Sequence, residues 1–335
     1  MIFLFKIPKR GENGTTGTLS RIWFNYKDYD KEGKLKLIAK FSNENEEVKK
    51  YVHSFRLYER EVVIYKEMHK KFSIDLPKIF FSEIDMKSGD SLIIMEDLVE
   101  KNYKIGSIEE GTSLENLKSL LFSISKHHSQ FWSYLPSQFC WLEESVFTNQ
   151  IKERATKNFS VSKQKFLDYN KEILSSQLFK KLENYSIEKY YLNLPNLQRT
   201  LIHADLHLNN VFFNEKIERR DLIIDWQNVI FDICTRDIVH LVVTSLPSLF
   251  LKENFQVLKD FYFSSLQRFL SPTIFERETF EMYFLLSVEF QFYVVCVTSA
   301  YISTSKDMIY INRAKRTIER YLNLVEIVGL KNIFN

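Results

Sequence analysis

The 335-residue sequence predicts an α+β fold, with a strand-rich part at residues 1–97 and a larger, mostly helical part at residues 98–335. Two observations support this division. Before residue 97, short segments alternate apolar and polar residues or run apolar between turn residues, a pattern typical of strands. After Ser113, apolar residues recur every three or four positions, which indicates amphipathic helices.

The composition narrows the class of protein before any motif is considered. With 45% hydrophobic and 27% charged residues and a net charge of +3, the chain is globular, and nucleic acid or an acidic membrane is excluded as its default partner. Its three cysteines form no Cys-x-x-Cys pair, which favours a reducing, cytoplasmic location. We expect no signal peptide and no membrane span, because the best apolar window, residues 282–297, contains Glu289 and Gln291.

The first part opens on a loop with glycines and continues as strands. Gly14 and Gly17 lie in the polar loop 9–19, and glycines let backbone amides approach a phosphate closely. A polar hairpin turn has the same composition, so both interpretations stay open. The predicted elements that follow are strands at residues 20–26, 34–41, 78–84 and 91–95, and an amphipathic helix at residues 52–68.

The second part is predicted to be built from helices with aromatic packing. Ser113 is the expected N-cap of a long helix, and His128 on its apolar stripe is interpreted as a packed, hydrogen-bonded residue. The lysine-rich residues 143–190 are predicted to form a helical insert near the acceptor site. Residues 255–324 are predicted to form three or four helices whose Phe and Tyr residues belong to the core.

Between these helical regions, residues 201–227 gather polar side chains around a short predicted hairpin. Its strands are residues 211–213 and 222–224. Their pairing would make Asn210 and Asp225 neighbours, with Asp205 one loop away. Oxygen ligands without cysteine suit a hard cation such as Mg²⁺. Phosphoryl transfer uses such a set, with one carboxylate to orient and deprotonate a hydroxyl while an Asn and an Asp hold the metal.

The motif His203-Ala204-Asp205, with Asn210 five residues after the Asp, resembles the H-G-D-x-x-x-x-N signature of the aminoglycoside phosphotransferase and choline kinase superfamily. The doubled Asn209-Asn210 and the Asp-Trp-Gln at residues 225–227 bring the chain closer to the ecdysteroid-kinase-like branch. Further support for that branch comes from Asp237 followed by Thr244-Ser245-Leu246.

The chain departs from the superfamily pattern at two points of this motif. Ala204 replaces the usual Gly, and Leu208-Asn209 replaces the Pro-Gly that is common in the antibiotic kinases. Neither change removes a chemical group, so we interpret both as variation.

The resemblance implies a two-lobed protein-kinase-like fold. A small N-terminal lobe, residues 1–97, would carry an antiparallel sheet and one helix and bind the nucleotide. A larger helical lobe, residues 98–335, would carry the catalytic loop and the acceptor site, with the active site in the cleft between the lobes. The implied activity is transfer of the γ-phosphate of ATP to a hydroxyl of a small molecule, with Mg²⁺ as cofactor.

The resemblance also implies roles for individual residues. Asp205 would be the catalytic base, Asn210 and Asp225 would be the Mg²⁺ ligands, and Asp237 would brace the catalytic loop without taking part in chemistry. The implied nucleotide contacts are the phosphate clamp of Lys40 with Glu61, the loop glycines Gly14 and Gly17, and the hinge positions Glu96 and Leu98.

Three alternatives stay open at the level of the sequence. The string Asp205-x-His207 is also typical of a two-metal phosphoesterase, although such a site needs further His, Asp and Asn ligands. A non-catalytic nucleotide-binding or scaffolding relative would carry the same groups. The stretch 201–227 is also consistent with a buried hairpin that binds nothing.

Overall fold

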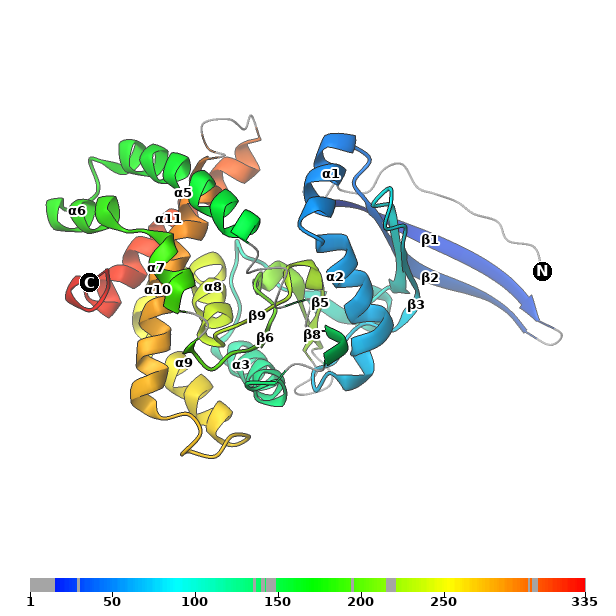
Figure 1. The fold of residues 1–335 in the computed structure, drawn as a ribbon. Helices are drawn as coiled ribbons and strands as arrows, with labels where there is room; N and C mark the ends of the chain where they lie inside the picture. Colours follow the sequence, from blue (N-terminus) through cyan, green and yellow to red (C-terminus); the bar gives the residue numbers. More distant parts are fainter. Residues whose placement is uncertain are drawn as a thin grey trace. The chain divides into compact units, whose positions relative to one another are not determined.

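The computed structural model describes residues 16–28, 31–134, 137–139, 142, 149–193, 196–214, 221–300, 302 and 307–334. The chain divides into two compact units (Figure 1). One contains Met1–Ile105 and Asn210–Val229, and the other contains Gly106–Asn209 and Ile230–Asn335. The first unit thus includes the hairpin that follows the motif His203-Ala204-Asp205. The sequence-based division into a nucleotide-binding lobe, 1–97, and an acceptor lobe, 98–335, stays a prediction.

The first unit is built on a four-stranded antiparallel sheet in the order β1-β2-β4-β3 (Figure 1). Apolar residues on one face, Ile22, Leu37 and Ala39, are buried together against Leu92 and Ile94. This alternation is what predicted the strands, because period-two patterning places one set of side chains on the core face. The strands are β1 Gly17–Asp28, β2 Lys31–Ser42, β3 Ile79–Ile84 and β4 Ser91–Glu96.

The single helix predicted at residues 52–68 is wrong in its bounds. It is interrupted at Arg56, which has a φ of 58° and therefore cannot continue a right-handed helix. The Arg56 guanidinium binds the Glu59 carboxylate at 2.6–2.7 Å in the next turn, which holds the chain in this conformation. The segment consists of α1 Glu46–Ser54, α2 Leu57–Val63, a π-helical turn Ile64–Met68 and a 3₁₀ turn His69–Lys71.

The predicted hairpin is confirmed. Strand β7 (Val211–Asn214) pairs with β8 (Leu222–Ile223) in antiparallel register, with Val211 opposite Ile223. A third strand that the sequence did not indicate, β5 (Tyr103–Ile105), pairs with the other edge of β7. The residues that connect the two strands, 215–220, lie outside the described residues.

The second unit is mostly helical, with β6 (Thr200–Ile202) and β9 (Ile230–Asp232) as an antiparallel pair. Ser113 caps its first helix by accepting a hydrogen bond from the Asn116 amide at 3.1 Å, as the sequence predicted. The helices are α3 Leu114–Gln130, α5 Asn149–Asn170, α6 Ser176–Asn184, α7 Ile187–Asn193, α8 Thr235–Ser245, α9 Ser248–Gln267, α10 Arg277–Ala300 and α11 Met308–Val328 (Figure 1). Further 3₁₀ turns lie in the first unit at Val99–Lys101 and Trp226–Asn228, at the boundary of the units at Leu208–Asn210, and in the second unit at Ser137–Phe139 and Leu330–Asn332.

The aromatic residues of the C-terminal helices form a core, as predicted. Phe292 of α10 is fully buried, and the centroid of its ring lies 5.3 Å from that of Phe166 and 6.1 Å from that of Tyr321. Helix α10 packs against α5, α8 and α11. Among the described residues it is also the one helix long and apolar enough to cross a membrane, although 56% of its most apolar window is buried inside the protein. Core helices meet the same criterion.

Candidate functional site

The first unit brings together the lysine, the glutamate and the aspartate that the sequence singled out. Lys40 lies in β2, and its Nζ is 2.8 Å from the Glu61 carboxylate of α2. The same Nζ is 2.7 Å from Oδ1 of Asp225, which lies two residues after the end of β8. Three segments far apart in the sequence therefore meet at one ammonium group.

Burial strengthens the electrostatic interactions within this cluster. The Lys40 side chain is 12% exposed and that of Glu61 is 2% exposed. Burial alone would lower the pKa of Lys40, but the charges of Asp225 and Glu61 outweigh it and raise this pKa above its usual value. Burial raises the pKa of Glu61 to about 7; Lys40 opposes this shift and Asp225 adds to it.

Asp225 is held in an uncommon backbone conformation. Its φ of 65° lies in the left-handed region, which Asp tolerates better than most residues. The Tyr65 hydroxyl accepts a hydrogen bond from the Asp225 amide at 3.2 Å, and Tyr65 is fully buried in the π-helical turn. The next residue, Trp226, is also buried and donates from Nε1 to the Ile223 carbonyl at 3.0 Å. These anchors fix where the Asp225 carboxylate points.

The second oxygen ligand predicted for the metal, Asn210, directly precedes β7 and lies at the same open end of the hairpin as Asp225. The Asn210 carbonyl accepts a hydrogen bond from the Ile224 amide at 2.9 Å, so Asn210 and Asp225 flank the paired strands. A carboxylate and an amide oxygen fit a hard cation such as Mg²⁺. Within the described ranges, no three His, Cys, Asp or Glu side chains form a metal-binding group. The two-metal phosphoesterase therefore finds no support among these residues.

The remaining predicted nucleotide contacts are placed in part. Gly17 opens β1, where a Cβ would lie 2.7 Å from the Phe41 carbonyl oxygen, so close strand packing explains this glycine. Gly14 lies outside the described residues. The Glu96 amide donates to the Lys78 carbonyl at 3.0 Å, and the Leu98 carbonyl accepts from the Lys101 amide at 3.0 Å. Adenine recognition at Glu96 and Leu98 stays a prediction.

The second unit holds the predicted base in a loop that is braced by one buried carboxylate. Asp237, in the first turn of α8, accepts hydrogen bonds at 2.8 Å from the backbone amides of His203 and Ala204. Its Oδ2 also lies 3.1 Å from Nε2 of His128, whose Nδ1 is 2.7 Å from the Tyr262 hydroxyl. These contacts confirm the bracing role expected for Asp237 and the packed, hydrogen-bonded state expected for His128.

Ala204 adopts a conformation that explains why a glycine is usual at this position. Its φ is 64°, in the left-handed region, where a Cβ costs about 1 kcal/mol. The two hydrogen bonds to Asp237 compensate by fixing the two peptide groups that precede the Ala204 Cα. The substitution therefore keeps the shape of the loop at some cost in stability.

Asp205 follows this braced turn, and its carboxylate is surrounded by histidines. Nε2 of His240 lies 3.2 Å from Asp205 Oδ1, and Nε2 of His207 lies 3.9 Å from the same oxygen. Burial alone would raise the pKa of Asp205, but His207 and His240 outweigh it and lower this pKa well below its usual range. The carboxylate is therefore ionised at neutral pH and can accept a hydrogen bond from a hydroxyl.

The sequence analysis missed two residues of the site, His240 beside Asp205 and Tyr65 beside Asp225. His240 lies three residues after Asp237 on α8, so helical spacing could have placed both on the face toward the loop. Tyr65 gave no signal apart from its place on the apolar face of a predicted helix.

Comparisons with solved structures identify the fold. The GDP complex of wild-type aminoglycoside 2'-phosphotransferase-IIIa superposes with a TM-score of 0.57 at 11% identity, covering 95% of this chain and 94% of that one. Plasmodium vivax ethanolamine kinase gives a TM-score of 0.50 at 14% identity, covering 96% of this chain and 81% of that one. The chain therefore has the two-lobed α+β fold of the kinase-like phosphotransferases, as its sequence predicted.

A comparison with family models identifies the branch. The model of the ecdysteroid kinase-like family matches residues 11–273. The chain belongs to this family. No curated protein sequence matches it.

Proposed function

We propose that this chain is a Mg²⁺-dependent small-molecule kinase that transfers the γ-phosphoryl group of ATP to a hydroxyl of its acceptor. The observation that carries the proposal is the buried contact of Lys40 with both Glu61 and Asp225, at 2.8 and 2.7 Å. A lysine held between a helix carboxylate and the proposed metal ligand is typical of the phosphate clamp in kinase chemistry. Membership of the ecdysteroid kinase-like family supports the same reaction class.

In the proposed reaction, the acceptor hydroxyl oxygen forms a bond to the γ-phosphorus as the bond to the β–γ bridging oxygen breaks. Asp205 accepts the hydroxyl proton, and ADP leaves. Because its pKa is lowered, Asp205 is a weak base that mainly orients the hydroxyl, which suits a loose transition state. Asn210 and Asp225 would hold Mg²⁺, which neutralises charge on the phosphates. Lys40 would position these phosphates, and Glu61 would position Lys40.

The proposed clamp predicts a coupled pair of variants. Lys40→Ala should lower turnover by about tenfold to a hundredfold, with a smaller loss of ATP affinity, because a lysine at the phosphates mainly positions the reacting group. Glu61→Ala should act in the same direction with a smaller effect. The double variant should lose less than the sum of the two in ΔΔG‡. Steady-state ADP release and calorimetric ATP titration measure these quantities, and full additivity would show that the two side chains do not act together.

The raised pKa of Glu61 predicts how stability depends on pH in the protein free of metal and nucleotide. A glutamate with a pKa of about 7 in the folded state binds its proton more tightly there than in the unfolded chain. The protonated Glu61 therefore makes its full contribution to the free energy of unfolding at acid pH, and this contribution is lost as pH rises through 7. The free energy of unfolding should fall by about 1 kcal/mol more between pH 6 and 8 in wild type than in Glu61→Gln. Equal pH slopes in denaturant titrations would contradict the shift.

A further inference from the structure

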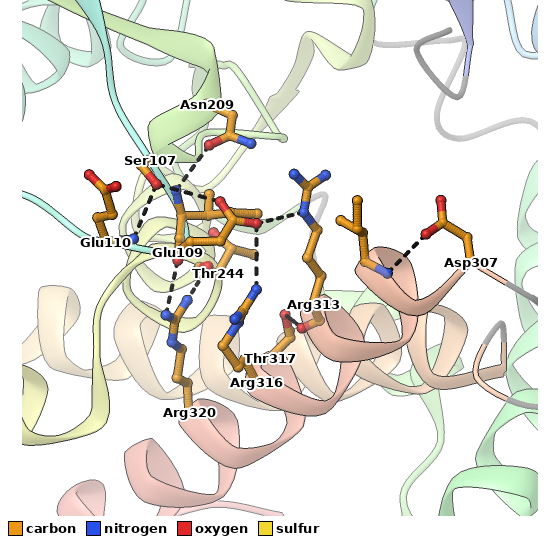
Figure 2. A network of polar contacts seen from close by, with 12 residues as sticks. Ser107, Glu109, Glu110, Asn209, Thr244, Asp307, Arg313, Arg316, Thr317 and Arg320 are labelled. Atoms are coloured by element: carbon orange, nitrogen blue, oxygen red, sulfur yellow. Dashed lines mark hydrogen bonds and ion pairs between the residues drawn. The ribbon is translucent and has the colours of Figure 1, made fainter. Parts of the chain in front are cut away.

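The C-terminal helix α11 presents three arginines to one loop of the second unit. Arg313, Arg316 and Arg320 are spaced by three and four residues and so lie on one face of the helix. They point toward residues 106–111, which we call the bracing loop (Figure 2). Helix α11 lies beyond the segment matched by the family model, which ends at residue 273.

Arg320 is the buried member of this set. Its residue is 4% exposed, and its guanidinium donates to the Ile108 carbonyl at 3.0 Å and to the Thr244 carbonyl at the end of α8 (Figure 2). Burial lowers the pKa of Arg320. Removing a guanidinium from water is costly, and hydrogen bonds to two carbonyls offset that cost only in this geometry. Arg320 therefore ties the bracing loop and α8 to α11.

The outer side of the bracing loop is held more weakly. Oε1 of Glu109 forms ion pairs with Nε of Arg313 at 2.8 Å and with Nη2 of Arg316 at 3.5 Å. All three side chains are more than a third exposed. Ion pairs this exposed to solvent contribute little to the stability of the fold. The loop is closed on itself by the Gly111 amide, which donates to the Ser107 carbonyl at 2.8 Å.

The inner side of the bracing loop contacts the catalytic loop. The Ile108 amide donates to Oδ1 of Asn209 at 2.9 Å (Figure 2). Gly106 packs so closely on Leu208 that a Cβ would lie 2.6 Å from the Leu208 carbonyl oxygen. Ile108 thus uses its carbonyl for Arg320 and its amide for Asn209. One residue transmits the position of α11 to the end of the catalytic loop.

We propose that Arg320 is a positioning residue for phosphoryl transfer, acting through the bracing loop on Leu208 and Asn209. These two residues belong to the short stretch of chain between Asp205 and Asn210, so their position sets how this stretch is held. The inference rests on the proposed function for its effect on turnover, but not for its effect on the loop. α11 is accordingly part of the support of the catalytic loop.

Amide hydrogen exchange of the full-length protein tests this directly. Arg320→Met keeps a long side chain without its donors, and peptides covering residues 106–111 and 203–209 should exchange about tenfold faster than in wild type. Arg320→Lys should restore part of the protection, and it replaces Arg320→Met if that variant does not fold. Asn209→Ala should also accelerate exchange at 106–111, because it removes the acceptor of the Ile108 amide. Asn323→Ala, on α11 but bonded to Ser248 at 2.9 Å, is the matched control and should leave both peptides unchanged.

Kinetics supply the second readout. In Arg320→Met, acceptor-independent hydrolysis of Mg-ATP should fall about tenfold in kcat, with KM changed by less than about twofold. Faster exchange at 106–111 alone, or unchanged exchange in both peptides, would overturn the proposal. If wild type turns over Mg-ATP neither alone nor with any acceptor, the kinase assignment fails, and the exchange result still decides the role of Arg320.

Discussion

Asp225→Asn should lower Mg²⁺-dependent turnover on the order of 10³-fold while the protein stays folded, because a neutral amide replaces the carboxylate proposed to hold the metal, and a metal stabilises the transition state by several kcal/mol. The same change removes the carboxylate that lies 2.7 Å from Lys40. Asn tolerates the left-handed backbone at this position, and the side chain is 25% exposed, so folding should be little affected.

Steady-state ADP release over a range of Mg²⁺ concentrations measures this effect. Asp90→Asn is the matched control, because Asp90 pairs with Lys49 in the same unit and has no proposed role in catalysis. It should retain wild-type turnover. Wild-type turnover of Asp225→Asn at every Mg²⁺ concentration would remove Asp225 from the metal site.

Asp205→Asn should lower transfer to the acceptor by roughly 10² to 10³, the scale of losing a positioned proton acceptor. An asparagine keeps the size of the side chain and can still contact His240, but it cannot take the hydroxyl proton. ATP affinity should be nearly unchanged, because Asp205 is proposed to face the acceptor. Acceptor-dependent ADP release measures the first effect, and calorimetric titration with Mg-ATP measures the second.

A comparison with Asp237→Asn separates the catalytic role proposed for Asp205 from the structural role of Asp237. Asp237 is fully buried and accepts the two backbone amides that shape the loop. Its substitution should lower the melting temperature as well as turnover, because one of these amides then faces a nitrogen. Asp205→Asn should lower the melting temperature less than Asp237→Asn, because the Asp205 side chain is 31% exposed and that of Asp237 is fully buried. Equal destabilisation by both changes would make Asp205 a structural residue.

The sequence predicted the parts of the site that depend on local pattern. The alternation around Lys40 placed it in a strand, and the polar flanks of the hairpin placed Asn210 and Asp225 beside its two strands. The pairing of Lys40 with Glu61 came from the family resemblance.

Other features depend on contacts that no local pattern encodes. The interruption at Arg56 lies in the middle of an apolar stripe with helical spacing, and a left-handed arginine has no sequence signature. Arg320 bonds to Ile108 across 212 positions of sequence, so only the packing of α11 shows what its charge contacts. The left-handed conformation of Ala204 was equally hidden, because alanine does not mark such positions as glycine does.

A screen of hydroxylated small molecules with Mg-ATP, run in parallel on wild type and Asp205→Asn, tests the kinase assignment most directly. Its readouts are ADP release and the mass of the acceptor. The assignment predicts that one class of hydroxyl compound raises ADP release and gains a phosphoryl group with wild type, and that Asp205→Asn loses this product by roughly 10² or more. ATP binding without turnover on any acceptor, in either form, would contradict the assignment and favour a nucleotide-binding scaffold.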